Sequence, residues 1–296
     1  MIGKLCIGLS GLCCLIVVVF VAAILGDIAY HGVHQLSWTF LTAAPTHGMT
    51  EGGIFPAIFG TAFLVILMTI AVIPLGVMTA IYLHEYASKK SRAVIWIRLA
   101  IQNLAGVPAI VFGLFGMGFF IQFVGGGIDK IFFHGQLAFG QPAILGAALT
   151  LALLTMPTVV VSTEESLRAI PAAHREVAYS LGATKLQMIR RIVLPQALGG
   201  ILTGTILAVG RGAGEVAPIL FTGAAYYLPY LPKKLNDQFM ELGYHIYVMA
   251  TQSPDVEATK PILYATVFVL LSLTFALNFT AIYIRSRIRQ RLRLER

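Results

Sequence analysis

The chain contains six long apolar runs, and these limit its fold more than any other feature. They cover approximately residues 5–29, 58–83, 99–123, 143–161, 197–221 and 262–284. A helix of about 20 residues crosses the roughly 30 Å hydrocarbon core of a bilayer. The sequence is 57% hydrophobic and only 11% charged, which excludes an ordinary soluble domain. We therefore expect an all-α polytopic membrane protein with six transmembrane helices, forming one domain over residues 1–296.

Positively charged residues are concentrated on one side of these predicted spans. They fall at Lys4, in residues 89–98 and 168–191, and in the arginine-rich tail 285–296. Because short cytoplasmic loops are rich in lysine and arginine, we expect both termini and these loops to be cytoplasmic. The net charge of +8 then reflects membrane topology and does not call for a nucleic-acid partner. The tail can also contact anionic lipid headgroups.

The first apolar run has an alternative interpretation as a secretory signal, because Lys4 precedes it and Val21–Ala23 resembles a cleavage site. The run is longer than the roughly 7 to 15 apolar residues that are usual in such a signal, so we expect an uncleaved first helix. All three cysteines, Cys6, Cys13 and Cys14, lie in it. Thiols on one helix have poor geometry for a disulfide, so we expect none.

No catalytic or cofactor motif is found in the sequence. It contains no G-x-x-x-x-G-K-[ST] phosphate loop and no G-x-S-x-G elbow, and His84-Glu85 does not continue to a second metalloprotease histidine. The sequence therefore offers no recognisable nucleotide-binding motif of its own. His31, His34 and His47 lie in the first external segment, where a metal site is one interpretation and solvated loop histidines are the better one.

A polar, basic segment from Pro171 to Pro195 interrupts the apolar chain. Pro171 can begin a helix and Gly182 can end one in a left-handed conformation, which predicts a short helix over residues 171–181. Beyond it, apolar residues recur at helical spacing at Leu186, Ile189, Ile192 and Val193. By periodicity alone, the segment could equally be an amphipathic helix pair at the membrane interface.

The fifth apolar run contains a charged pair, Arg211 and Glu215, whose spacing of four places both on one helix face. Each charge costs at least about 2.5–3.5 kcal/mol at the bilayer centre, so both should face protein or a water-filled path. Arg211 lies about 21 Å into a helix that begins at residue 197, which is beyond the midplane. The pair can either tether neighbouring helices or line a transport pathway.

A guanidinium in a polar path is suited to an oxyanion, because its planar fork can hold two oxygens at once. Phosphate is the natural candidate. Glu215 can weaken the grip of Arg211 enough for release, and it can accept a hydrogen bond from a protonated phosphate. Both roles of Glu215 are hypotheses.

Two external features complete the pattern. Gly125–Gly127 predicts a flexible turn before the fourth span. The loop 223–260 contains the apolar run 239–250, which is too short to span and should lie at the interface or in the mouth of a pathway. Three tyrosines of this loop either contact a soluble partner or act as interfacial aromatics: Tyr226, Tyr227 and Tyr230.

The segment 171–195 fits the pattern E-A-A, three residues, G, nine residues, I-x-L-P, with Val177 in place of one alanine. In this it resembles permease subunits of ATP-driven ABC importers. The resemblance implies the type I ABC importer permease fold, in which a short helix sits in a groove of the ATPase and carries its closing motion to the membrane. The coupling residues would then be Glu176, Ala178, Gly182, Arg175 and Tyr179.

Further stretches resemble the PstA family of phosphate-importer permeases of the bacterial inner membrane. They are TEGGIFPAIFGT from Thr50, IPLGVMTAIYLHEYA from Ile73, GVPAIVFGLFG from Gly106 and GRGAGEVAPILFT around Arg211. This resemblance implies phosphate passage at Arg211 and Glu215. The implied partners are a homologous PstC-like permease, two PstB-like ATPases that bind ATP and Mg, and an external PstS-like phosphate-binding protein. The alternatives are a permease for sulfate, molybdate or phosphonate, or a membrane receptor or scaffold without transport.

Overall fold

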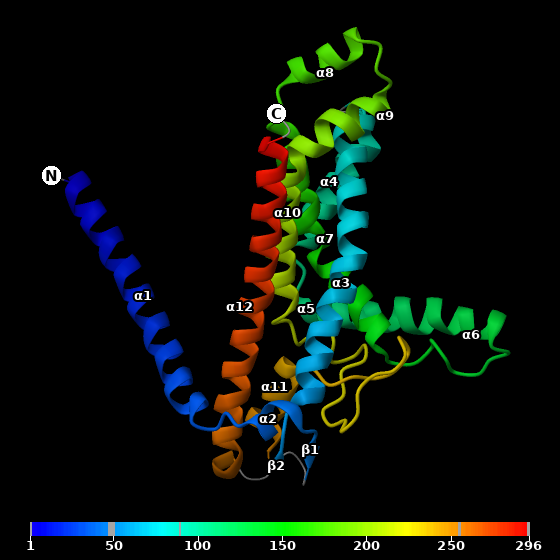
Figure 1. Cartoon of the computed structure of the whole chain (residues 1–296). Helices are drawn as coiled ribbons and strands as arrows, with labels where there is room; N and C mark the ends of the chain where they lie inside the picture. The colour runs from blue at the N-terminus through cyan, green and yellow to red at the C-terminus, as the bar shows by residue number, and fades with distance from the viewer. Residues whose placement is uncertain (1, 47–50, 89, 254–255, 295–296) are drawn as a thin grey trace.

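The computed structural model describes residues 2–46, 51–88, 90–253 and 256–294. It is a helical bundle in which α3 packs on α7, α7 on α10, and α10 on α12 (Figure 1). The bundle helices are α3 (Phe55–Ile81), α7 (Ile144–Arg168), α10 (Leu194–Gly212) and α12 (Val256–Leu294). The long helix α1 (Ile2–Val33) contacts α12 and diverges from the bundle towards its N-terminal end.

Shorter elements connect and cap these helices. A small antiparallel pair of strands follows α1 and α2 and pairs Pro45 with Gly52. The remaining elements are α2 (Trp38–Thr42), β1 (Pro45–Thr46), β2 (Glu51–Gly52), η2 (Tyr82–Tyr86), α4 (Arg92–Leu104), α5 (Ala109–Gly116), η3 (Met117–Gly125), α6 (Gly126–Phe132), α8 (Ala172–Ser180), α9 (Lys185–Met188), η4 (Ile189–Val193) and α11 (Leu242–Gln252). The η segments are π-helical turns that continue neighbouring α-helices.

In the part of the chain that the structure describes, six helices are long and apolar enough to cross a membrane, as the composition predicts. They cover residues 6–33, 55–86, 109–132, 144–168, 185–212 and 256–288. The fourth is the most enclosed, with 61% of its most apolar 18-residue window buried, whereas none of the corresponding window of the first is buried. The outer helices therefore present apolar surface that lipid or another membrane chain must cover.

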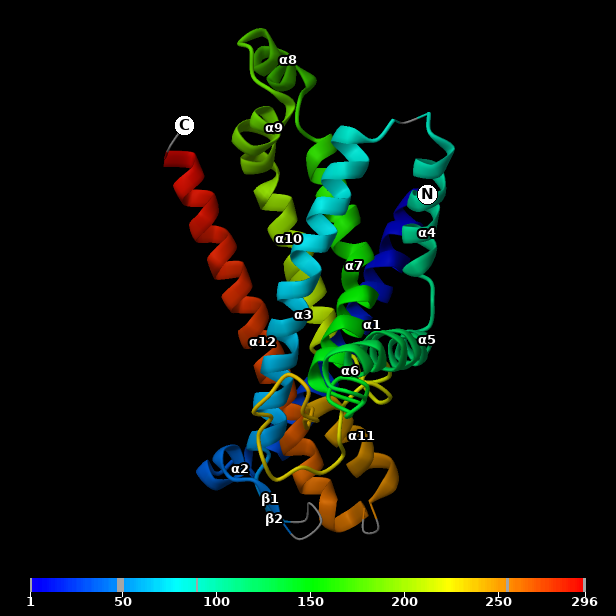
Figure 2. The same cartoon turned by 90° about the vertical axis from the view of Figure 1, so that its right-hand side faces the viewer.

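The third apolar run differs from its prediction as one helix over residues 99–123. It is divided into α4, which ends at Leu104, and a rod formed by α5, η3 and α6. Pro108 stands at the division as the N-cap of α5, with ψ 138°. A proline disfavours helical backbone in the residue before it and has no N–H to donate, which interrupts the helix here. The rod runs across the bundle and projects from its side (Figures 1 and 2).

The predicted turn at Gly125–Gly127 is also corrected, because these glycines are helical and join η3 to α6. Gly125 is required by close packing instead, since a Cβ there would overlap the carbonyl oxygen of Phe139. The carboxylate of Asp129 in α6 accepts the backbone N–H groups of Ala138, Phe139 and Gly140. The loop after α6 is thereby folded back against the rod.

The fifth run ends at Gly212 and not at residue 221. Residues 213–223 form irregular turns that include Pro218. At the other end, η4 and α9 extend the same helical rod back to Lys185. The first described residues of α1 and the last of α12 lie towards the end of the bundle that carries α8 (Figure 1). Which face of the membrane this end occupies remains a prediction from the charge distribution.

Candidate functional site

The polar segment after α7 forms the short helix that the sequence predicts. Helix α8 begins after Pro171, which has φ −56° and ψ 139°, and Gly182 follows its end with φ +77°. The backbone N–H of Ala183 donates to the Ala178 carbonyl at 3.0 Å, which closes the helix end in the manner of a left-handed glycine cap. Helix α8 stands beyond the ends of α3 and α7, at the tip of the molecule (Figures 1 and 2).

The two faces of α8 have different environments. Ala178 is buried and packs in a cluster with Leu167, Ile170 and the α9–η4 segment. Glu176 and Tyr179 are exposed, as a docking role requires. Val177 and Leu181 are exposed as well, Leu181 by 82%, and the motif reading did not single them out as contact residues. Val177 and Leu181 are four residues apart, so they share one face at the end of this helix.

Arg175, like Ala178 and unlike Glu176 and Tyr179, contacts the rest of this chain. Its Nη2 lies 2.8 Å from Oε1 of Glu85, at the end of the α3–η2 helix. The side chains are 18% and 6% exposed, respectively. The sequence-based prediction missed Glu85, because the pair is separated by 90 residues.

The helix after Gly182 begins with a capping box. The N–H of Gln187 donates to Thr184 Oγ1 at 3.3 Å, and the N–H of Thr184 donates to Gln187 Oε1 at 2.9 Å. The predicted apolar face is present with one change: Leu186 is exposed and Met188 occupies the buried position. This helix continues through Pro195, the second residue of α10, where the π-helical turn η4 passes into the α-helix and the proline has no N–H to donate.

Arg211 and Glu215 are in contact, although they do not share a helix. Arg211 lies in the last turn of α10, and Glu215 lies in the irregular turn beyond it. Nε of Arg211 donates to Oε1 of Glu215 at 3.1 Å. The side chains are 41% and 22% exposed, so within this chain the pair is not a buried tether between helices.

The surroundings of Arg211 leave most of its guanidinium available. Leu207, Arg211 and Gly214 form an exposed strip along and just beyond α10, while Ala208, Val209 and Gly212 on the other side are buried. Within the described residues, Nη1 and Nη2 of Arg211 have no hydrogen-bond or ion-pair partner. The two Nη groups of Arg211 therefore lie on a face of α10 that this chain does not cover.

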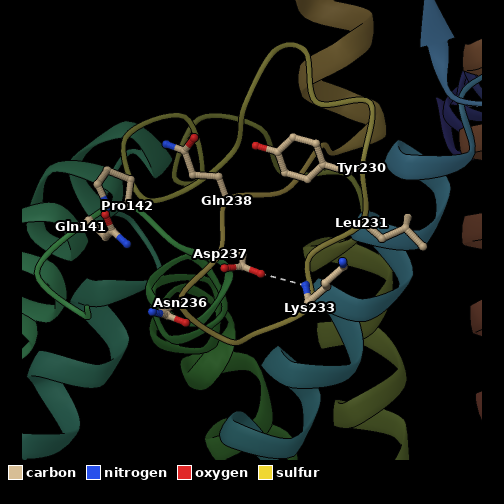
Figure 3. Close-up of a pocket in the computed structure, with 8 residues that line it drawn as sticks. All are labelled: Gln141, Pro142, Tyr230, Leu231, Lys233, Asn236, Asp237 and Gln238. Carbon is tan, nitrogen blue, oxygen red and sulfur yellow. Dashed lines mark hydrogen bonds between the residues drawn. The ribbon is translucent and has the colours of Figure 1, made fainter. Parts of the chain in front are cut away.

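A polar cavity of about 550 Å³ lies at the opposite end of the bundle from α8, between the loop before α7 and the loop before α11 (Figure 3). Its lining residues are Gln141, Pro142, Tyr230, Leu231, Lys233, Asn236, Asp237 and Gln238. The Asp237 carboxylate accepts the N–H groups of Lys234 and Lys233, and these hydrogen bonds lower the pKa of Asp237. Neither Arg211 nor Glu215 lines this cavity.

The N-terminus of α7 is closed by the same loop and is not available to an anion. The N–H of Ile144 donates to the carbonyl oxygen of Asp237 at 2.9 Å, and that of Leu145 donates to the carbonyl of Leu235 at 3.1 Å. Backbone carbonyls thus satisfy donors that a helix end leaves unpaired. The cavity is a gap between packed loops, and its two charged lining residues, Lys233 and Asp237, are of opposite sign.

The apolar run 239–250 tucks against the bundle. It forms most of α11, which packs against α12 and α3. Glu241 is 2% exposed and caps α11 by accepting the N–H groups of Gly243 and Tyr244. Tyr226 and Tyr230 are exposed, whereas Tyr227 donates its hydroxyl to the Pro45 carbonyl at 3.1 Å.

The predicted histidine cluster is only partly described, because His47 lies outside the described residues. His31 pairs with Asp27 at 3.1 Å, and His34 contacts the Tyr30 carbonyl. In the ranges that the structure describes, no three His, Cys, Asp or Glu side chains gather as metal ligands.

Comparison with known families decides the class of this chain. The family described as "Binding-protein-dependent transport system inner membrane component" matches residues 72–293, which include α8, Arg211 and Glu215. The chain belongs to this family. It is accordingly a multi-pass membrane component of a binding-protein-dependent transport system.

Similar family members cover most of the chain. It is 31% identical over 269 residues to the "Probable ABC transporter permease protein YqgI" of Bacillus subtilis (strain 168), with 86% of each chain covered. It is 33% identical over 220 residues to the "Probable phosphate transport system permease protein PstA" of Methanocaldococcus jannaschii, covering 74% of this chain and 70% of that protein.

A solved structure supports the fold. A chain in the structure of a bacterial alginate ABC transporter, in complex with an alginate pentasaccharide-bound periplasmic protein, superposes with a TM-score of 0.66. The alignment covers 92% of this chain and 90% of the other at 17% identity. At this identity the similarity concerns the fold alone. The predicted ABC importer permease fold is thereby confirmed.

Proposed function

We propose that this chain is the permease subunit of an ATP-driven importer of inorganic phosphate. The observation that carries the proposal is the guanidinium of Arg211, which is held by Glu215 through Nε and presents both Nη groups on an uncovered face of α10. The name of the archaeal relative, a probable phosphate transport permease, supports the choice of substrate.

The chemistry of the pair suits transient binding of an oxyanion. Two adjacent Nη groups can donate to two phosphate oxygens, which is the bidentate geometry that arginine favours. Glu215 contributes a negative charge 3.1 Å from Nε, so the net field at the site is weaker than that of a lone arginine. A bound anion can then leave again. When protonated phosphate passes, the Glu215 carboxylate can accept its hydrogen bond, which fully ionised sulfate does not offer.

The partners follow from what the chain presents. Helix α1 exposes an apolar surface, and the strip formed by Leu207, Arg211 and Gly214 is exposed along and just beyond α10. A homologous permease could cover both surfaces and would then enclose the pathway at Arg211. Glu176, Val177, Tyr179 and Leu181 on α8 would contact an ATPase subunit. ATP and Mg would bind that ATPase, and an external binding protein would deliver phosphate. In this proposal the chain performs binding and gating and catalyses no reaction of its own.

The direct test is uptake of labelled phosphate into proteoliposomes that contain the whole reconstituted complex, with ATP supplied on the α8 side. We expect uptake that requires ATP and persists in excess unlabelled sulfate or molybdate. Inhibition by either competitor would assign a different oxyanion. An intact complex that hydrolyses ATP without any uptake would contradict the transport proposal and favour a receptor or scaffold.

Substitutions at the pair test the site itself. Arg211→Ala removes charge-assisted hydrogen bonds worth about 1.5–3 kcal/mol, so phosphate uptake at low concentration should fall by about 10- to 150-fold. Arg168→Gln, at the exposed end of α7, is the matched control and should retain uptake. Glu215→Gln should alter release and the preference for phosphate over sulfate. Unchanged uptake and unchanged preference in both Arg211 and Glu215 variants would remove the pair from the pathway.

A further inference from the structure

The strongest connection between α8 and the rest of the chain passes through one guanidinium. Arg175, in the first turn of α8, donates from Nε at 3.2 Å and from Nη2 at 2.8 Å to the same carboxylate oxygen, Oε1 of Glu85. Glu85 belongs to η2, the π-helical turn that ends the α3 rod. His84 Nε2 lies 3.9 Å from the same oxygen. The π-turn thus holds the carboxylate against α8.

The same guanidinium also binds the end of α7. Nη2 of Arg175 donates to the carbonyl oxygen of Leu167 at 3.0 Å, and Nη1 donates to that of Ile170 at 2.9 Å. Carbonyl groups in the last turn of a helix have no partner within that helix, and they carry the negative end of its dipole. Arg175 therefore joins three elements at once: α8, the end of the α3 rod and the end of α7.

Helix α8 has a further side-chain contact with the bundle, which is exposed to solvent: His174 Nδ1 lies 2.8 Å from Oε1 of Gln196 in α10. The helix also packs on the α9–η4 segment, with Ala178 as its buried side chain. The alanine side chain buries little area, so this contact alone would transmit little of a displacement of α8 to the bundle. An ion pair whose carboxylate is 6% exposed resists separation more strongly, because separation leaves a desolvated charge without its partner.

We propose that Arg175 and Glu85 are the positioning residues that transmit displacement of α8 to α3 and α7. Arg175 acts within the chain and does not serve as a contact for the ATPase. This inference rests on the proposed function, since α8 is moved by an ATPase only in a transport complex. When α8 shifts, the guanidinium draws the ends of α3 and α7 with it, and α7 passes the movement to α10, which carries Arg211.

A second arginine at the same end of the bundle offers a matched control. Arg98 of α4 lies 2.9 Å from Glu164 of α7 and donates to the Leu83 carbonyl at 2.8 Å. Its carboxylate partner is similarly enclosed, with 14% exposure, and it likewise binds the end of the α3 rod. It has no contact with α8 among the interactions of the described residues. Loss of Arg98 should affect stability without interrupting the path from α8.

The first measurement is the ratio of phosphate transported to ATP hydrolysed, in complexes that retain their ATPase subunits on gel filtration. Coupling energies between sites correspond to about 5- to 150-fold effects, and we expect Arg175→Gln and Glu85→Gln to lower the ratio about tenfold or more. Arg98→Gln should leave the ratio unchanged. Arg175→Lys keeps the charge but lacks the planar fork, so its ratio should be intermediate.

A double variant separates transmission from general damage. If the two residues act only through each other, Glu85→Gln with Arg175→Gln should lower the ratio no further than the more severe single variant. A ratio that stays at the wild-type value in Arg175→Gln would overturn the proposal. An equal fall in Arg98→Gln would overturn it as well, because the effect would then be structural.

A second readout does not depend on the transported substrate. The three cysteines of this chain, Cys6, Cys13 and Cys14, are first replaced by serine. Met78→Cys then places a thiol on the exposed face of α3, about two helical turns before Glu85. We expect ATP to change its alkylation rate, and Arg175→Gln to abolish that change while Arg98→Gln preserves it. If wild-type complexes fail to transport phosphate but show this pattern, the substrate is wrong and the link stands. An alkylation rate that ignores ATP while Arg175 is present, or responds to it in Arg175→Gln, would refute the link.

Discussion

Replacing Glu241 with glutamine should remove a pH dependence from the stability of this protein. The Glu241 carboxyl is enclosed where α11 meets α3, with Thr61 Oγ1 3.5 Å from its Oε1. Burial raises the pKa of Glu241 from 4.5 to about 7, and the N–H groups of Gly243 and Tyr244 offset only part of that rise. Glutamine has nearly the same shape and does not titrate.

The sign and size of this pH dependence follow from the linkage between unfolding and the release of the Glu241 proton. The folded protein keeps the Glu241 proton up to a pH of about 7, whereas the unfolded chain releases it near its ordinary pKa of 4.5. Between these values unfolding releases a proton, so the free energy of unfolding falls as the pH rises. Each unit of pKa difference corresponds to about 1.4 kcal/mol, which yields a loss of about 2–3 kcal/mol between roughly pH 5 and pH 8. Only well below pH 4.5 and well above pH 7 does Glu241 contribute no slope.

The assay is thermal unfolding of the detergent-solubilised complex, followed by circular dichroism at pH 5 and pH 8, in the wild type and in Glu241→Gln. Other titrating groups cancel in the difference between the two proteins. We expect the midpoint of Glu241→Gln to rise relative to wild type by roughly 4–10 °C between these pH values. Glu257→Gln, an exposed carboxylate 85% accessible to solvent, is the control and should show no such trend. A difference between wild type and Glu241→Gln that is independent of pH would refute the reasoning.

Two glycine substitutions test the packing and the end of α8. A Cβ at Gly60 would overlap the backbone carbonyl of Met240, so Gly60→Ala should lower the free energy of unfolding by about 1–3 kcal/mol in denaturation experiments. Gly199→Ala in α10 meets open space and should be neutral or mildly stabilising; equal losses in both would contradict the packing argument. Gly182→Ala forces a side chain into φ +77° at a cost of about 1–2 kcal/mol, and should weaken retention of the ATPase on gel filtration. Asparagine tolerates this conformation, so Gly182→Asn should weaken retention of the ATPase less than Gly182→Ala does. If Gly182→Asn weakened it more, backbone strain would be excluded as the cause.

Much of the local structure could be predicted because it depends on neighbouring residues. Pro171 and Gly182 bracket α8 through their own backbone preferences, and both act as the sequence predicts. Arg211 reaches Glu215 because four residues of chain separate them, and the contact survives even though α10 ends at Gly212. The family pattern around α8 similarly depends on spacing along one continuous segment.

Predictions failed where packing between distant segments decided the conformation. The glycines 125–127 read as a turn, yet they are helical, and at Gly125 the loop around Phe139 occupies the space that a Cβ would take. The third apolar run is a different case, because the local backbone restriction at Pro108 divides it into α4 and the rod, and packing decides only that the rod lies across the bundle. Composition measures how much surface must leave water, but it does not specify a direction for each helix.

The sequence by itself determined that this chain is a helical membrane protein with six apolar runs, a short polar helix after the fourth run, and an arginine–glutamate pair. These properties depend on residues that are close together in the sequence, so they can be predicted without knowing how the rest of the chain folds. Only the tertiary structure decided that Arg175 is directed to Glu85 and the end of α7, that Glu241 is enclosed beside Thr61, and that Arg211 lies on an uncovered face. Those features join residues that the chain separates widely, and they exist only because the folded bundle brings its helices together.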